Sequence, residues 1–132
     1  METNKLYNLA DSSGVTVDFF PLPHNKSVCV NVDGRDFVAL DPTVFGSQER
    51  VCLAHELGHC ATAGFYGTHA PLAVRQRHEK KAWAWAIKCL VPLSELKKAQ
   101  QRGYTDIVQL AEYFTVTRDF MKRAMDFYMQ NQ

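Results

Sequence analysis

The sequence has no marked excess of charge of either sign and no long apolar run. Lys and Arg total 15 and Asp and Glu total 14, which leaves a formal net charge of +1. This balance does not favour a strongly basic nucleic-acid-binding protein. No run approaches the roughly 18 apolar residues of a membrane span, and the N-terminus lacks the basic-then-apolar order of a signal peptide. We therefore expect a cytoplasmic protein without a membrane partner.

The sequence also lacks a disulfide framework, because its four cysteines do not have the spacing of one. The cysteines form no CxxC pair, and without an export signal reduced thiols are expected. The hydrophobic share of 46% and the charged share of 22% are ordinary for a globular protein, which argues against disorder, collagen or a coiled coil. The length of 132 residues predicts a single domain.

Charge is distributed unevenly between the two halves of the chain. Residues 1–66 carry 4 basic and 8 acidic side chains, and residues 67–132 carry 11 basic and 6 acidic ones. Such an asymmetry can mark a face that binds a partner. We favour the simpler interpretation that the second half is helical and uses Lys and Arg as solvated side chains.

The first 40 residues predict a short helix followed by a small antiparallel sheet. The helix covers Thr3–Ala10, and apolar residues then alternate with polar ones over 15–19 and again over 28–32. Asp33-Gly34 is a strong hairpin signal, so residues 37–40 are expected to form the return strand.

From Ser47 onward the pattern becomes helical. Ser47 is a plausible N-cap for a helix that runs to about Ala63, and a long helix follows over Leu72–Leu90, before Pro92. Shorter helices are expected after the predicted N-caps Ser94, Thr105 and Thr117. The sequence thus predicts an α+β fold.

The first of these helices contains the HExxH pattern, His55-Glu56-Leu57-Gly58-His59. Residues four apart lie one helical turn apart, so both imidazoles can reach one Zn²⁺ at about 2.0–2.1 Å. Glu56 would then lie beside the open coordination position and could take a proton from the zinc-bound water. An apolar stripe forms the other side of the helix, which leaves the histidines free to face a cleft: Leu53, Leu57, Cys60 and Ala61.

A catalytic zinc site needs a third protein ligand, and Glu79 is the best candidate. It shares a helix face with an apolar stripe of Ala82, Trp83, Ala86, Ile87 and Leu90. A carboxylate in such a stripe is costly unless it is paired, and a metal ion is one possible partner. The alternative is that Glu79 only complements the dipole of the first helical turns.

Other side chains near the motif are weaker candidates. Cys52 lies three residues before His55 and also projects toward the histidine face, but small buried cysteines are common in cores. Tyr66, His69 or His78 could donate a hydrogen bond to an oxyanion. We interpret each of them as an ordinary loop or surface residue, and His24 as part of a connection between strands, so we assign none of them a role.

Three segments together resemble the ImmA/IrrE family of metallopeptidases. They are Ala54–His59, the helix Glu79–Pro92 with its alanines and aromatic residues, and residues 110–117. The resemblance extends over about residues 5–128. Two positions depart from the usual pattern, because Trp83 stands where Asn or Asp is common and Trp85 stands where Phe is common.

The resemblance implies a zincin-like fold and a zinc-dependent peptidase with one zinc ion per chain. His55, His59 and Glu79 would be the zinc ligands and Glu56 the general base. The expected organisation is a single domain over 1–132. Residues 1–92 would hold a mostly antiparallel three-stranded sheet and the metal-site helices, and 93–132 a short helical segment.

The resemblance also suggests a substrate. Members of the family act as anti-repressors that cleave helix-turn-helix repressors of prophages, integrative elements or stress regulons. We therefore expect a helix-turn-helix transcriptional repressor as the protein substrate. The predicted hairpin over residues 28–40 would offer a sheet edge on which an extended substrate could lie as an added strand.

Two alternatives remain open. Residues 106–127 read as helix, short turn and helix with basic residues after the turn, which is compatible with a DNA-binding regulator. The turn lacks glycine, however, and Phe120, Met121 and Met125 suggest packing on the core, so we do not expect direct nucleic-acid binding. The other alternative is a non-catalytic module that blocks a repressor by binding it.

Overall fold

Three strands and six helices follow one another along the part of the chain that the computed structural model describes, residues 1–66 and 69–131. The N-terminal elements are α1 (Thr3–Ser12), β1 (Thr16–Phe19), β2 (Ser27–Val32), β3 (Arg35–Leu40) and α2 (Gly46–Ala61). The remaining elements are α3 (Leu72–Leu90), α4 (Leu93–Gln101), α5 (Ile107–Phe114) and α6 (Arg118–Gln130). The α+β class is confirmed. Of the helices described, none has both the length and the apolar character needed to cross a membrane.

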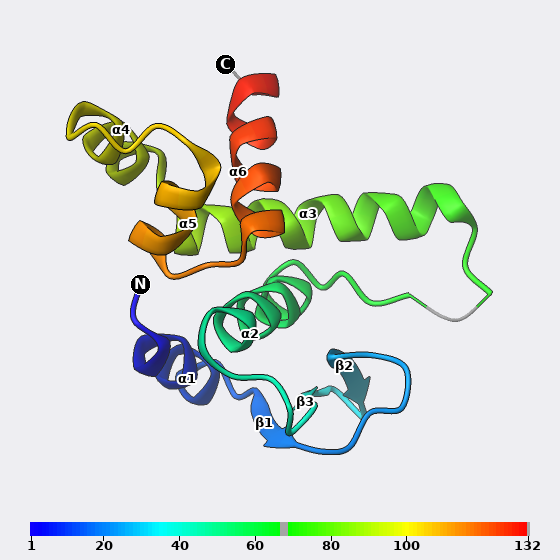
Figure 1. The fold of residues 1–132 in the computed structure, drawn as a ribbon. Helices are drawn as coiled ribbons and strands as arrows, with labels where there is room; N and C mark the ends of the chain where they lie inside the picture. The colour runs from blue at the N-terminus through cyan, green and yellow to red at the C-terminus, as the bar shows by residue number, and fades with distance from the viewer. Residues whose placement is uncertain (67–68, 132) are drawn as a thin grey trace.

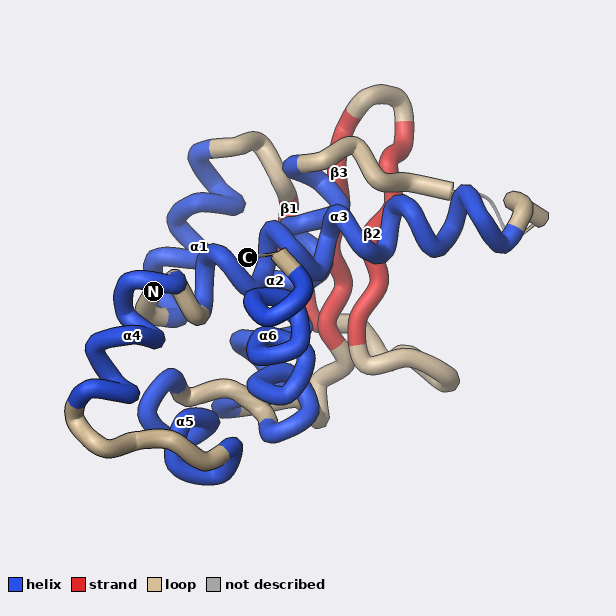
Figure 2. The backbone as a smooth tube through the Cα atoms, turned by 90° about the horizontal axis from the view of Figure 1, so that it is seen from above, coloured by secondary structure: helices blue, strands red, loops and turns tan. Residues whose placement is uncertain are grey.

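The sheet is mixed, with strand order β1-β3-β2. β2 and β3 pair antiparallel, whereas β1 and β3 pair parallel, so the prediction of an antiparallel sheet is wrong for β1. Residues 20–26, with their two prolines, carry the chain from β1 past the middle position to the far edge, and β3 returns between the two strands. Figure 2 shows the three strands side by side in this order.

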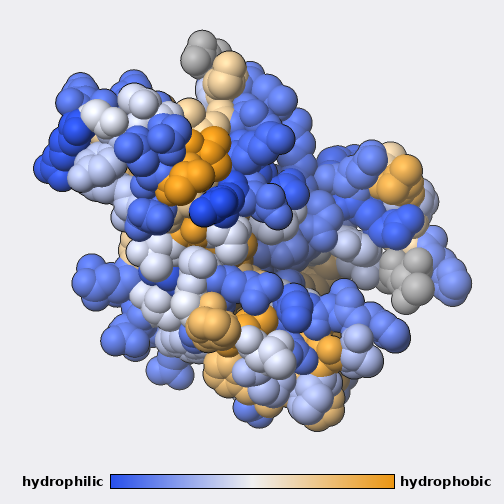
Figure 3. All heavy atoms as spheres, in the orientation of Figure 1, coloured by the Kyte–Doolittle hydropathy of each residue, from blue (hydrophilic) through white to orange (hydrophobic). Residues whose placement is uncertain are grey.

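The hairpin between β2 and β3 forms as predicted. Asp33 and Gly34 both have a positive φ, of 52° and 81°, as a two-residue type I′ turn requires. On the outer side of the sheet the alternating valines are exposed, with Val30 at 49% and Val32 at 52%. Apolar side chains therefore gather at the sheet end of the molecule in the space-filling view (Figure 3).

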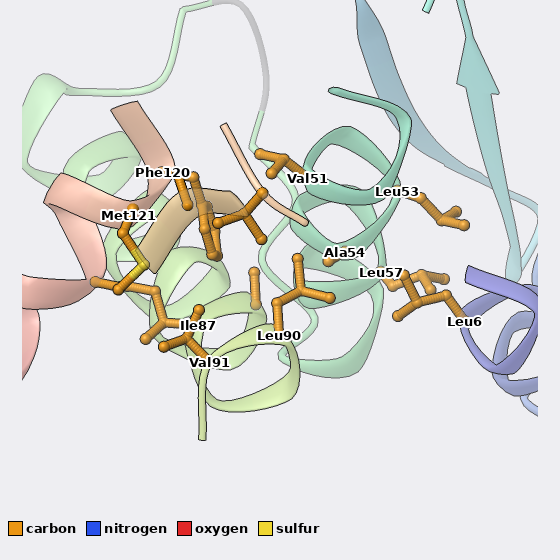
Figure 4. Close-up of a cluster of buried hydrophobic side chains, with 14 of the residues drawn as sticks. Leu6, Val51, Leu53, Ala54, Leu57, Ile87, Leu90, Val91, Phe120 and Met121 are labelled. Carbon is orange, nitrogen blue, oxygen red and sulfur yellow. The ribbon is translucent and has the colours of Figure 1, made fainter. Parts of the chain in front are cut away.

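Helix α2 lies between the sheet on one side and α3 on the other (Figure 1). Leu53 and Leu57 point toward Leu6 of α1, whereas Ala54 lies on the side nearer to Leu90 of α3 (Figure 4). All five side chains are buried. Buried side chains therefore pack on two sides of α2, and both contacts fix its position in the fold.

The backbones of α2 and α3 touch where the helices cross. A Cβ atom added at Gly58 would lie 2.5 Å from the carbonyl oxygen of Ala82 and 3.1 Å from its Cα. Real Cβ atoms do not approach a backbone so closely, so glycine is the residue that permits this crossing. Since Glu79 lies one turn before Ala82, the crossing brings it to the histidines that flank Gly58.

A buried arginine joins α2 to the N-terminus and to the end of α5. Arg50 is 7% exposed, and its guanidinium donates to the carbonyl oxygens of Thr115 at 2.9 Å, Phe114 at 3.2 Å and Met1 at 2.5 Å. Thr115 has a left-handed backbone and ends α5. These bonds hold the turn between α5 and α6 against the helix that carries the HExxH pattern.

Helix α3 begins and ends as predicted, but three of the four predicted N-caps are wrong. α2 and α4 begin after Phe45 and Pro92, ahead of Ser47 and Ser94, and α5 is capped by Asp106 rather than Thr105. Thr117 does cap α6, where its hydroxyl accepts from the backbone N–H of Phe120. The predicted helix end near Ala63 is also late, because α2 ends at Ala61.

The substitution Gly58→Ala tests the close crossing of the two helices. Alanine normally stabilises a helix by about 1 kcal/mol relative to glycine. Here its methyl group would collide with the Ala82 carbonyl, so we expect the free energy of unfolding to fall by about 1–3 kcal/mol. Urea denaturation measures this change, and an unchanged or more stable variant would show that the helices do not cross so closely.

Candidate metal centre

The two histidines of α2 and the glutamate of α3 converge on one point. The Nε2 atom of His55 lies 2.8 Å from Oε2 of Glu79, and Nε2 of His59 lies 3.1 Å from the same oxygen. One potential ligand atom from each side chain lies within 4.8 Å of the other two. The structure thus brings together the three residues that the sequence singled out as metal ligands.

The hydrogen bond on the far side of His59 supports a metal at this point. Its Nδ1 lies 2.7 Å from the carbonyl oxygen of Gly64, so Nδ1 carries the proton that it donates there. In the neutral ring, the lone pair of Nε2 then faces the carboxylate oxygen of Glu79. Two such acceptors repel unless a cation lies between them, and the donor set of two imidazoles and one carboxylate suits Zn²⁺.

The turn after α2 places this carbonyl. The backbone N–H of Gly64 donates to the carbonyl oxygen of His59 at 2.8 Å, and Ala63 adopts a positive φ of 52°. The chain therefore curls back at the end of the helix. A Cβ atom at Gly64 would lie 3.2 Å from Nδ1 of His59, which leaves little room for a side chain there.

Glu56 is buried beside the histidines. It is 5% exposed, and its Oε2 accepts a hydrogen bond from the hydroxyl of Ser27 at 2.6 Å and lies 3.4 Å from Nδ1 of His55. Burial alone raises the pKa of Glu56, but His55, Ser27 and His59 outweigh it and the pKa is lowered overall. Glu56 is therefore a carboxylate at neutral pH, as a general base must be.

The pKa values of the other two charged groups follow the same balance. Burial lowers the pKa of His55, yet the carboxylates of Glu56 and Glu79 outweigh burial and raise it overall. Burial raises the pKa of Glu79, and the two histidines and Tyr66 lower it overall. Glu79, like Glu56, is therefore ionised at neutral pH.

These residues line a pocket of about 350 Å³. Its other walls are the start of β2, which contributes Ser27, Val28 and Cys29, and the segment after α2 with Tyr66. Sequence reasoning missed Ser27, because nothing in its neighbourhood in the sequence marks it as a partner of Glu56. Only the position of β2 beside α2 brings the two together.

The residues to which the sequence assigned no role have different surroundings. Tyr66 donates from its hydroxyl to Oε1 of Glu79 at 3.0 Å, so it holds the second carboxylate oxygen. His78 stacks on Tyr66 with ring centroids 6.2 Å apart. His24 and His69 are exposed, and neither of them lines the pocket.

Cys52 does not join the group of ligand atoms found among the described residues. Burial raises the pKa of its thiol, although the hydroxyl of Ser27 acts in the opposite direction. The geometry therefore favours Glu79 over Cys52 as the third ligand.

Comparison with known proteins agrees with this site. The profile of a peptidase family, Peptidase_M78, described as the IrrE N-terminal-like domain, matches residues 10–126. The chain belongs to this family. The matched range of this IrrE N-terminal-like domain includes α2, α3 and most of α6, and it confirms the resemblance drawn from the sequence. No curated protein matches the chain significantly.

Replacing Glu79 in this IrrE N-terminal-like domain tests the third ligand. Glu79→Ala removes the oxygen on which both imidazoles converge. The intact site is expected to hold about one zinc per chain, and the purified variant should contain far less. Elemental analysis of the purified protein measures the content. Glu95→Ala on α4, a glutamate whose side chain is 47% exposed, is the control and should retain zinc. Full zinc content in the Glu79 variant would refute the assignment.

Proposed function

We propose that this protein is a zinc-dependent endopeptidase that hydrolyses a peptide bond in a specific protein substrate. His55, His59 and Glu79 bind the zinc ion, and Glu56 acts as the general base. The observation that carries the proposal is the convergence of both Nε2 atoms on one oxygen of Glu79, beside a buried, ionised Glu56. Membership in a peptidase family supports it.

The residues of the site have separate roles in the proposed reaction. When bound, zinc lowers the pKa of a water ligand toward about 7 and polarises the scissile carbonyl. Glu56 takes the proton of the attacking water and passes it to the leaving amine. The Ser27 hydroxyl holds Oε2 of Glu56, which leaves Oε1 as the atom that receives the proton. The Gly64 carbonyl keeps the His59 ring oriented, and the Tyr66 hydroxyl keeps the Glu79 carboxylate oriented.

An extended segment of the substrate fits the free edge of β2. This strand lies at the edge of the sheet, and its first residues line the pocket that contains Glu56. A peptide that paired with this edge would gain main-chain hydrogen bonds, and its alternate side chains would set specificity. A complex in which the peptide makes no main-chain pairing with β2 would remove this part of the proposal.

For the substrate, we propose a helix-turn-helix transcriptional repressor of a mobile element or stress regulon in the cytoplasm. This part is supported by the resemblance of most of the chain to the ImmA/IrrE family. The DNA-binding alternative gains no support from α6. The helix buries Phe120, Met121 and Ala124 against the protein, and Arg123 lies over Trp83.

Glu56→Gln separates catalysis from binding. The amide cannot act as a base, so cleavage of a co-encoded repressor should fall by about 100-fold or more while zinc is retained. Fragment masses after incubation measure cleavage, and elemental analysis measures zinc. Glu95→Gln on α4 is the control, because this glutamate does not line the pocket, and the substitution should leave cleavage and zinc content unchanged.

The same experiment distinguishes the non-catalytic alternative. If the wild-type protein binds the repressor, leaves it intact and still relieves repression, the protein is a binding module and the endopeptidase proposal is wrong. Cleavage by Glu56→Gln at the wild-type rate would contradict the role of Glu56.

A further inference from the structure

Trp83 of α3 lies between the candidate metal centre and the C-terminal helix. Its ring stacks on the imidazole of His55, with centroids 3.9 Å apart and planes 12° apart. The guanidinium carbon of Arg123 lies 4.2 Å from the centroid of the Trp83 ring, and the buried ring of Phe120 lies 6.0 Å from it. Side chains from α2, α3 and α6 therefore meet at one indole.

The two close neighbours occupy opposite faces of the indole. A ring that stacks nearly parallel at 3.9 Å leaves no room for a guanidinium at 4.2 Å on the same face. Stacking of aromatic planes and a cation over the face of Trp are both favourable arrangements. The salt bridges found among the described residues do not include Arg123, whose guanidinium lies over the Trp83 ring instead.

His55 depends on this stack more than His59 does. The Nδ1 atom of His59 is fixed by the Gly64 carbonyl at 2.7 Å. The corresponding nitrogen of His55 has only the carboxylate of Glu56 at 3.4 Å, beyond the usual length of a hydrogen bond. Apart from Oε2 of Glu79, which lies 2.8 Å from Nε2 at the metal side of the ring, the indole face is the closest ring contact of His55 among the described residues.

Helix α6, which contacts the indole, is itself fixed by contacts at its N-terminal end. Phe120 and Arg123 are three residues apart and so lie on one face of the helix. Thr117 caps the start of α6, and Arg50 donates to the carbonyl oxygens just before it. Because Arg50 lies on α2 with His55, the chain closes a ring of contacts from α2 through α6 and Trp83 back to α2.

We propose that Trp83 is a positioning residue of the metal centre, which fixes the plane of the His55 imidazole while Arg123 and Phe120 of α6 hold the indole in place. The C-terminal helix is thereby part of the support of the metal site. This inference rests on the metal binding in the proposed function, but it does not depend on peptide hydrolysis.

The first test compares zinc affinities by competition with a chromophoric chelator. Trp83→Leu keeps an apolar side chain but removes the aromatic face, and its affinity should fall by about 10-fold or more, as for loss of other groups that orient a metal ligand. Trp83→Phe restores an aromatic face and should recover most of the affinity. Trp85→Phe, two residues along the same helix and in a pocket lined by Leu9 and Leu57, should bind zinc like the wild type.

Tryptophan fluorescence gives a second measurement that needs no substrate. In Trp85→Phe the remaining indole is the one stacked on His55, so zinc added to the metal-free protein should change its emission. In Trp83→Phe the remaining indole lies away from the site, and zinc should leave its emission unchanged. This comparison remains decisive if Trp83→Leu fails to fold.

The contribution of α6 is tested with Arg123→Leu. This substitution removes the guanidinium that lies over one face of the indole. It should weaken zinc binding, but by less than Trp83→Leu does. Arg118→Leu, an exposed basic residue in the first turn of the same helix, is the matched control and should leave the affinity unchanged.

Two results would overturn the proposal in distinguishable ways. The first is a folded Trp83→Leu variant that binds zinc with wild-type affinity, or a Trp85→Phe variant that binds zinc without any change in its emission. Either observation would refute the positioning role and leave the proposed function intact. Absence of zinc binding in the wild-type protein would refute the proposed function and this inference together.

Discussion

The contact between the backbones of α2 and α3 at Gly58 and Ala82 determines the geometry of the whole site. The HExxH spacing arranges His55 and His59 on one helix, but it cannot supply a third ligand. The close crossing does so, because it brings the turn of α3 that carries Glu79 to within hydrogen-bond distance of both rings. A side chain at Gly58 would separate the helices at the point where they must be closest.

Each group of the site is then supported by a different part of the chain. The turn after α2 orients His59 through the Gly64 carbonyl, and the start of β2 holds Glu56 through Ser27. Tyr66 binds the second oxygen of Glu79. The departure from the family pattern at Trp83 also gains a physical account, because the indole stacks on His55 and links it to α6. The small fold is thus arranged around three converging side chains.

The sequence predicted what depends on local periodicity. Helical spacing sufficed for the two histidines, the apolar stripe of α3 identified Glu79, and Asp33-Gly34 identified the hairpin. The parallel pairing of β1 was missed because it depends on strand order. Ser27 and Arg123 were missed because only tertiary packing brings them to the site. The residues next to each of them in the sequence do not indicate that packing. The single-domain boundary, the repressor substrate and the cytoplasmic location stay predictions.

The central claim is that two imidazoles and one carboxylate, from α2 and α3, bind a single zinc ion. X-ray absorption at the zinc edge of the purified protein tests it most directly. The account predicts about one zinc per chain with only nitrogen and oxygen neighbours at about 2.0–2.2 Å, including two imidazoles. A sulfur neighbour at about 2.3 Å would place a cysteine in the site and contradict the account, as would a protein that binds no zinc.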